Sequence, residues 1–223
     1  MPQNMLGIHG VVGLTCAVGD GGKILHFAGD LYEPREVQSP TVNTLRAVWV
    51  ESPVSAWSVG DAGTVLHFDG HRWHSVALAS HHDDLLSIWG HDGDVWIGGT
   101  HRLILHRPHA VGGMVVDTAH TIKGIWGTGR NDLWLLADDA TALHIGGGGY
   151  QALPVSGLAS DRYNAIAGTS SEDAYLVGDL GVVARWDGRE WRDLPSCTGD
   201  TFTGVCGGDA GDIWATTGTG DLW

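Results

Sequence analysis

The chain has 223 residues, and 12 Lys and Arg stand against 26 Asp and Glu, for a formal net charge of −14. A surface this acidic repels phosphate backbones and anionic headgroups, so we expect no nucleic-acid partner and no membrane binding. No apolar run approaches the ~20 residues of a membrane-spanning helix. Residues 1–5 lack the basic and apolar regions of a signal peptide, so a cytoplasmic location is the default expectation.

The composition favours an all-β fold. Glycine accounts for 35 residues and Trp for 11, and short β-prone runs alternate with Gly, Asp and Ser. That pattern is typical of many short strands joined by tight turns. The three cysteines, Cys16, Cys197 and Cys206, are too few for a disulfide framework, so we expect buried free thiols. A bond between Cys197 and Cys206 stays an open alternative.

Four landmarks recur along the chain with a period of about 40 residues. The first landmark is the last residue of a short apolar segment: His9, Trp49, Trp89, Trp126, Ala167 and Cys206. The second is aromatic in five of its six copies: Cys16, Trp57, Trp96, Trp134, Tyr175 and Trp214. The third ends a short aliphatic run: His26, His67, His106, His144 and Arg185. The fourth opens the last phrase of the repeat: Tyr32, Trp73, Tyr150 and Trp191.

Each landmark lies in a short apolar phrase bounded by Gly, Asp, Ser or Pro, which predicts four strands in each repeat. The links at 19–22, 60–63 and 178–181 are rich in Gly and Asp, and such residues supply the positive φ of hairpin turns. The strands are apolar on both sides, so one sheet alone cannot bury its two faces. The predicted fold is therefore an all-β propeller of about six four-stranded antiparallel blades, the last incomplete.

We expect one propeller domain over residues 1–223, with repeats at about 6–44, 45–84, 85–121, 122–162 and 163–201 and a partial repeat at 202–223. The sixth repeat stops before its third landmark. Three explanations stay open: the last blade is thin or is completed by the N-terminal residues, the chain is part of a longer repeat protein, or another subunit completes the sheet. Because an unpaired edge strand invites association, self-association through the incomplete last blade is one expected form of partner.

The order of the phrases Ile-Trp-Gly, Asp-x-Trp-x-Val-Gly, Gly-x-x-Leu-His-Phe and Asp-Gly-x-x-Trp resembles bacterial propeller-repeat proteins of the BNR/Asp-box or kelch-like type, such as those of myxobacteria. The chain departs from a true Asp-box, because Asp and Gly are adjacent and no Ser or Thr lies two residues before the Asp. The phrase also looks like one in small fucose-binding propeller lectins. That likeness implies a sugar site at Arg185, Glu190 and Trp191.

The histidines of the third landmark suggest a metal cluster at first sight. Equivalent residues of neighbouring blades lie in different sheets, about 10 Å apart, whereas zinc needs its ligands within ~2.1 Å. We therefore expect hydrogen-bonded histidines between blades, with no metal and no cofactor. The loop His81-His82-Asp83-Asp84 is the better candidate for an adventitious metal, and a solvated turn is the simpler interpretation of it.

The tryptophans divide by their place in the repeat. Those of the second strand are expected in the core: Trp57, Trp96, Trp134 and Trp214. Those that end the innermost strand are candidates for ligand binding at one mouth of the central channel: Trp49, Trp89 and Trp126. An acid that precedes the second strand is expected to bond nearby backbone N–H groups in an Asx turn: Asp94, Asp132, Asp173 and Asp212.

These features favour a non-catalytic binding or scaffold propeller that mediates protein interaction. A carbohydrate-binding lectin is the alternative, and a glycoside hydrolase or lyase of a propeller family is a weaker one. Catalysis finds little support because the acids recur at turns rather than converging in a cleft. A specific site is expected where the copies of the repeat differ, as at Arg107-Pro108-His109 and residues 127–131.

Overall fold

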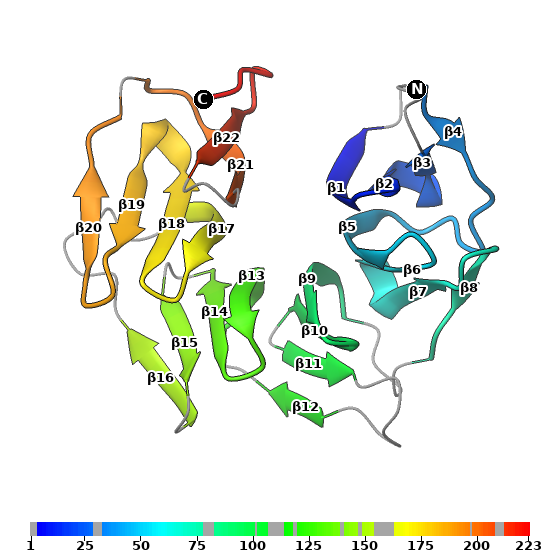
Figure 1. Cartoon of the computed structure of the whole chain (residues 1–223), viewed down its shortest axis with the longest axis horizontal. Helices are drawn as coiled ribbons and strands as arrows, with labels where there is room; N and C mark the ends of the chain where they lie inside the picture. The colour runs from blue at the N-terminus through cyan, green and yellow to red at the C-terminus, as the bar shows by residue number, and fades with distance from the viewer. Residues whose placement is uncertain are drawn as a thin grey trace. The chain divides into compact units, whose positions relative to one another are not determined.

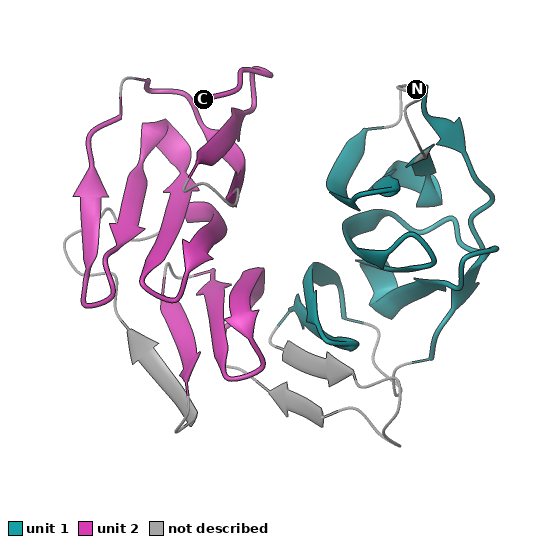
Figure 2. Ribbon diagram, viewed as in Figure 1, with its two compact units in different colours: residues 1–119 teal, residues 120–223 magenta. Residues whose placement is uncertain are grey.

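The computed structural model describes residues 4–28, 33–77, 83–100, 102–106, 114–117, 120–138, 141–146, 149–153, 163–196, 198–207 and 212–223. The chain divides into two compact units, residues 1–119 and residues 120–223 (Figure 2). The regular elements are antiparallel strands and short 3-10 turns, so the predicted all-β class is confirmed. The described residues include no helix long and apolar enough to span a membrane.

Unit 1 contains three four-stranded meanders in which each strand pairs with its neighbour in sequence (Figure 1). The first sheet holds β1 (Met5–Val11), β2 (Leu14–Gly19), β3 (Ile24–Ala28) and β4 (Arg35–Glu36). The second holds β5 (Leu45–Ser52), β6 (Ser55–Gly60), β7 (Thr64–Phe68) and β8 (Trp73–Ser75). The third holds β9 (Leu85–His91), β10 (Asp94–Gly99), β11 (Arg102–His106) and β12 (Met114–Asp117).

Unit 2 repeats this arrangement in two full sheets and one shorter sheet. The fourth sheet holds β13 (Ile122–Gly129), β14 (Asp132–Ala137), β15 (Ala142–Gly146) and β16 (Gly149–Leu153). The fifth holds β17 (Tyr163–Ser170), β18 (Asp173–Gly178), β19 (Val183–Trp186) and β20 (Trp191–Leu194). The sixth holds β21 (Phe202–Gly207) and β22 (Ile213–Thr217).

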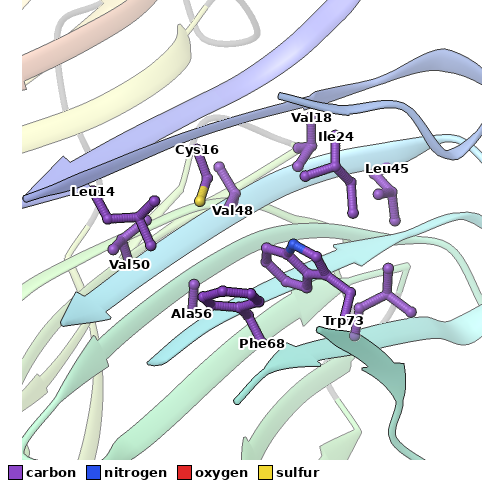
Figure 3. Close-up of a cluster of buried hydrophobic side chains, with 11 residues drawn as sticks. Leu14, Cys16, Val18, Ile24, Leu45, Val48, Val50, Ala56, Phe68 and Trp73 are labelled. Atoms are coloured by element: carbon purple, nitrogen blue, oxygen red, sulfur yellow. The ribbon is translucent and has the colours of Figure 1, made fainter. Parts of the chain in front are cut away.

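Within each unit, consecutive sheets pack face to face, with their first strands in contact. Side chains alternate along each strand, so every sheet has two distinct faces. We call the face that carries the second landmark the forward face and the opposite one the back face. The forward face of the first sheet, with Cys16 and Val18, packs on the back face of the second, with Val48 and Phe68 (Figure 3). Burial raises the pKa of the Cys16 thiol to about 12, so this thiol belongs to the core.

The links between second and third strands form tight 3-10 turns in three sheets: Asp20–Gly22, Asp61–Gly63 and Asp179–Gly181. The middle residue of each turn has positive φ, at 66° in Gly21, 54° in Ala62 and 56° in Leu180. Only Gly adopts this left-handed conformation without steric cost. Ala62 and Leu180 are therefore strained where Gly21 is not, and the Leu180 side chain is exposed.

The sixth sheet differs from a complete blade. Only β21 and β22 are strands, and the end of the chain lies beside β22 through a bridge between Thr216 and Leu222. Ala215 and Trp223 each donate a backbone N–H to the other's carbonyl at 2.9 Å. The count thus differs from six full blades: five described sheets have four strands and the sixth has two.

Trp214 corrects one sequence-based prediction. Trp57, Trp96 and Trp134 are buried in the core as expected, whereas Trp214 is exposed. The three buried rings lie on forward faces of complete four-stranded sheets, and Trp214 lies on that of the two-stranded sixth sheet. The same residue type at the same position of the repeat is thus buried in three four-stranded sheets and exposed in the two-stranded sheet. Cys206, the cross-strand neighbour of Trp214, is an exposed free thiol, contrary to the expected burial, and Cys197 lies outside the described residues.

Candidate functional site

A ladder of aromatic rings follows the ends of the first strands in unit 1. The His9 ring stacks on Trp49 with centroids 4.2 Å apart, and Trp49 lies 5.9 Å from Trp89. His91 continues the ladder, parallel to Trp89 at 5.9 Å. Nδ1 of His9 accepts the backbone N–H of Val50 at 3.0 Å, and burial lowers the pKa of His9. These contacts hold neutral His9 between two sheets.

The candidate tryptophans Trp49 and Trp126 pack on glycines of the following sheet. A Cβ placed on Gly90 would lie 2.4 Å from Nε1 of Trp49, and one placed on Gly168 would lie 2.6 Å from Cη2 of Trp126. The Gly of the Ile-Trp-Gly phrase therefore makes room for a ring of the preceding sheet. Trp49 and Trp126 are half-buried and Trp89 is buried. All three have packing roles, and Trp49 keeps an accessible part.

An apolar surface that the sequence analysis missed lies at the tips of two hairpins whose first strands carry His9 and Trp49. It comprises Val12, Gly13, Pro53 and Val54 at the tips of the β1–β2 and β5–β6 hairpins, and we call it the hairpin-tip surface. Val12 is 97 % exposed and Val54 is 63 % exposed. The two tips are adjacent, because a Cβ on Gly13 would lie 3.1 Å from Cγ of Pro53. The missed signal is that turn positions, ordinarily polar, hold two valines.

Acidic side chains lie near the hairpin-tip surface. Glu51 is exposed, accepts a hydrogen bond from Ser55 at 3.0 Å, and its Oε1 lies 3.8 Å from the Cβ position of Gly93 in the third sheet. The side chain of Asp92 in the same β9–β10 turn is 78 % exposed. The apolar tips and the half-buried Trp49 are thus accompanied by negative charge.

Arg185 lies on the forward face of the fifth sheet, opposite Tyr175 on one neighbouring strand and Arg192 on the other. Its Nε donates to Asp173 at 2.6 Å, and its guanidinium lies 5.6 Å from the Tyr175 ring centroid. Burial alone would raise the pKa of Asp173, but hydrogen bonds from Thr169 and Arg185 outweigh it and hold that pKa below its usual range. Arg185 remains about half exposed.

The structure separates the three residues of the predicted sugar site. Trp191 pairs with Trp186 and is buried against Trp134 on the back face, whereas Arg185 lies on the forward face. Glu190 is exposed in the turn and accepts a hydrogen bond from Arg192 at 2.8 Å. The hairpin register turns Arg185 and Trp191 to opposite sides of one sheet.

The Asp-Gly-x-x-Trp phrase is a hairpin turn stabilised by its Asp. Oδ1 of Asp69 accepts the backbone N–H groups of His71 and Arg72, each at 2.9 Å. Asp187 accepts those of Arg189 and Glu190 in the same way. These hydrogen bonds lower the pKa of both carboxyl groups. The largest effect on Asp69 comes from the N–H of Arg72, and the largest effect on Asp187 comes from the N–H of Glu190. The phrase resembling a lectin motif therefore has a structural role.

Two of the four acids before the second strand, Asp132 and Asp173, act differently from the prediction. Instead of bonding nearby backbone N–H groups, Asp173 accepts the Thr169 hydroxyl at 2.7 Å, and Asp132 accepts that of Thr128. The other oxygen of Asp132 bonds Nε2 of His144 at 2.6 Å. The acid thus joins its own hairpin to the third strand.

Histidines of the third landmark pack on aromatic rings. His67 lies over Trp57 with centroids 4.2 Å apart, and His144 lies over Trp134 at 4.3 Å. Within the described part of the chain, no three His, Cys, Asp or Glu side chains gather closely enough to hold a metal ion. His81, His82 and the Arg107-Pro108-His109 segment lie outside the described residues.

Comparison with known proteins places the fold. No protein-family description matches the chain, and no curated protein matches its sequence. A solved structure of YCF48 bound to D1 peptide superposes on 99 % of this chain and 78 % of its own length, with a TM-score of 0.77 at 11 % identity. The structure of a catalytically inactive virginiamycin B lyase from Staphylococcus aureus with quinupristin superposes on 99 % of this chain and on 83 % of its own length, with a TM-score of 0.78 at 14 % identity.

The fold is that of a β-propeller. Identities this low show the architecture and no activity. These two propellers differ in function, since one is bound to a peptide and the other is a lyase. Function must therefore be argued from the surfaces of this chain.

Proposed function

We propose that the chain is one propeller domain of about six blades, the last incomplete, which binds protein partners without catalysis. The observation that carries this proposal is the hairpin-tip surface, where Val12 and Val54 are largely exposed, together with the half-buried Trp49 in the first strand of the β5–β6 hairpin. Exposed apolar residues that cluster at loop tips mark interaction sites, because a lone domain gains nothing from presenting them to water. YCF48, solved bound to the D1 peptide, offers a precedent for this use of the fold.

The occupant that fits best is an extended segment of a protein partner with an apolar side chain flanked by Lys or Arg. The apolar side chain would pack on Val54 and Trp49, and the basic residues would face Glu51 and Asp92. A net charge of −14 also speeds the approach of a basic partner.

A random peptide library displayed on phage tests this proposal. Clones selected on the wild-type chain should be enriched in basic and apolar residues, and Val54→Asp should weaken their binding at least about 10-fold. The matched control is Val42→Asp. Val42 is also an exposed valine, but it lies before the start of β5, whereas Val54 follows the end of that strand. Equal binding by both variants would place the peptide elsewhere and overturn the assignment.

Carbohydrate binding is the second candidate, at Arg185, which lies on the opposite face of its sheet from Trp191 and apart from Glu190, or at the aromatic residues Trp49, Trp89 and Trp126. Arg185 beside Tyr175 is the observation in its favour, as an exposed cation next to an aromatic ring. A glycan array decides: saccharide binding abolished by Arg185→Ala supports the lectin, and no binding by the wild-type chain removes it.

Hydrolase or lyase activity is the third candidate and rests on the similarity of fold to a lyase. Self-association through the incomplete sixth sheet is compatible with all three candidates.

A further inference from the structure

Two histidines of the first sheet accept hydrogen bonds from the second sheet. Nδ1 of His9 accepts the backbone N–H of Val50 at 3.0 Å, and Nε2 of His26 accepts the indole N–H of Trp73 at 3.0 Å. His9 lies on the first strand of its sheet and His26 on the third. The two bonds therefore fasten the same pair of sheets at two separate places.

The strand register places both histidines in one row on the forward face of the first sheet. The row crosses the four strands as His9, Cys16, His26 and Arg35. Two strand spacings, about 10 Å, separate the histidines. Cys16 lies between them, buried in the core that the two sheets share. Both rings thus belong to the packed interface between the sheets.

Each bond requires a neutral imidazole ring. Only a ring nitrogen without a proton can accept, so His9 carries its proton on Nε2 and His26 carries its proton on Nδ1. A second proton would turn the accepting nitrogen into a donor and set it against another N–H group. Burial lowers the pKa of both histidines, and Arg35 lowers that of His26 further. The closed interface therefore favours the neutral rings.

The groups that face the two rings do not offset the cost of a charge. The Cys16 thiol is neutral, because burial raises its pKa to about 12, and Arg35 repels a charged His26. The second sheet presents apolar side chains to this face (Figure 3): Val48, Val50, Ala56, Leu66, Phe68 and Trp73. Other ionisable groups of the two sheets are exposed or bond elsewhere: Glu33, His71 and Arg72 are exposed, Glu36 pairs with Lys23, Arg46 with Asp61 and Glu51 with Ser55, and Asp69 bonds its own turn. His67 and His74 lie on the opposite face of the second sheet, in the row of Trp57.

We propose that the interface between the first and second sheets is a pH-sensitive joint, which opens when His9 and His26 are protonated. Their contribution to closure is fully present above the pKa of an unburied histidine, about 6.5, and is lost as the pH falls through the lowered values of the closed joint. Each proton taken up on opening raises the opening constant by up to about 10-fold per pH unit. Two protons give up to about 100-fold.

Opening of the joint would divide the hairpin-tip surface. Gly13 belongs to the first sheet's hairpin and Pro53 to the second's, and a Cβ on Gly13 would lie 3.1 Å from Cγ of Pro53. Acid would therefore release a partner that is bound across both tips. This consequence rests on the proposed peptide binding, whereas the joint itself does not, and its test uses no peptide.

Native-state hydrogen exchange of the Val50 amide and the Trp73 indole tests the joint between about pH 4.5 and 7. Corrected for intrinsic exchange rates, the opening constant of both groups should rise by up to about 100-fold per pH unit below pH ~6.5. His9→Asn and His26→Gln keep a side-chain oxygen as acceptor and cannot titrate. Either variant alone should reduce the rise at both groups to about 10-fold per pH unit, and the double variant should abolish it.

His71→Asn is the matched control, because His71 is exposed in a turn, and it should keep the wild-type dependence. If His26→Gln left the exchange of the Val50 amide unchanged, the two bonds would break independently and the joint would be overturned. An opening constant that does not vary with pH would overturn it as well. A chain that shows the expected exchange but binds no peptide supports the joint and removes only its consequence for binding.

Nitrogen-15 NMR of the wild-type chain supplies a test that needs no variant. The spectrum should show the Nε2–H form of His9 and the Nδ1–H form of His26 at neutral pH, and both rings should gain their second proton together with the opening. The opposite form of either ring, or protonation of both rings while the Val50 and Trp73 groups stay protected, would contradict the proposal.

Discussion

Trp73 in the fourth strand of the second sheet donates its indole Nε1–H to Nε2 of His26 in the third strand of the first sheet, at 3.0 Å. The bond ties the outer strands of two neighbouring sheets together. Trp191 occupies the equivalent place in the fifth sheet, but its buried Nε1 has no hydrogen-bond partner among the described residues. The histidine equivalent to His26 is His144, and its Nε2 bonds Asp132 instead.

This difference predicts unequal effects of the same substitution. Trp73→Phe should lower the free energy of unfolding by about 1 to 2 kcal/mol more than Trp191→Phe, because only the first change leaves a part-buried His nitrogen unpaired. Both rings are similarly buried, so the packing losses should largely cancel in the comparison. Urea unfolding of the two variants measures this, and equal losses would show that the bond contributes no net stability.

His9 predicts a pH dependence of stability. Burial lowers its pKa in the folded chain, so folding favours the neutral ring. Its contribution is fully present above the unfolded-state pKa of about 6.5 and is lost as the pH falls through the lowered folded-state pKa. His9→Asn keeps an acceptor for the Val50 N–H and cannot titrate. It should flatten the fall in unfolding free energy below pH ~6.5, whereas His71→Asn, at an exposed turn, should leave that slope as it is.

Leu180 predicts a stabilising glycine. Leu180→Gly should raise the free energy of unfolding by about 1 kcal/mol, because glycine relieves the left-handed backbone at φ 56°. Ala62→Gly in the equivalent turn should act in the same direction, and Gly21→Ala should act in the opposite one. Thermal unfolding of the three variants is sufficient, and a neutral Gly21→Ala would refute the argument from strain.

Gly90 predicts a steric effect on the aromatic ladder. Gly90→Ala should destabilise the chain by about 2 kcal/mol, since the new Cβ would lie 2.4 Å from Nε1 of Trp49 and displace the indole. Trp fluorescence should change in parallel. Gly199→Ala is the control, because nothing lies within 4 Å of that Cβ position. Unchanged fluorescence in Gly90→Ala would mean that Trp49 is not packed as described.

The sequence predicts the core that all repeats share well, and it predicts poorly the surfaces at which one repeat differs from the others. Trp57 and Trp134 are buried as expected, because periodicity reports what all copies share. Trp214 has the same sequence context and is exposed, because it lies on a sheet of two strands, and the local sequence around the tryptophan does not report the size of its sheet. The split between Arg185 and Trp191 follows from the pairing of Trp186 with Trp191, and such a register cannot be derived from spacing alone.

The alternation of faces also constrains how the repeats can vary in length. Deleting Leu133 from β14 would turn Trp134 from the forward to the back face, and every following side chain of that strand would change face as well. A residue gained or lost in a turn leaves both faces unchanged. We therefore expect length variation between related chains to concentrate at hairpin tips and connections. The hairpin-tip surface lies at such places. Related chains can therefore change the residues that bind a partner without changing the residues that form the core.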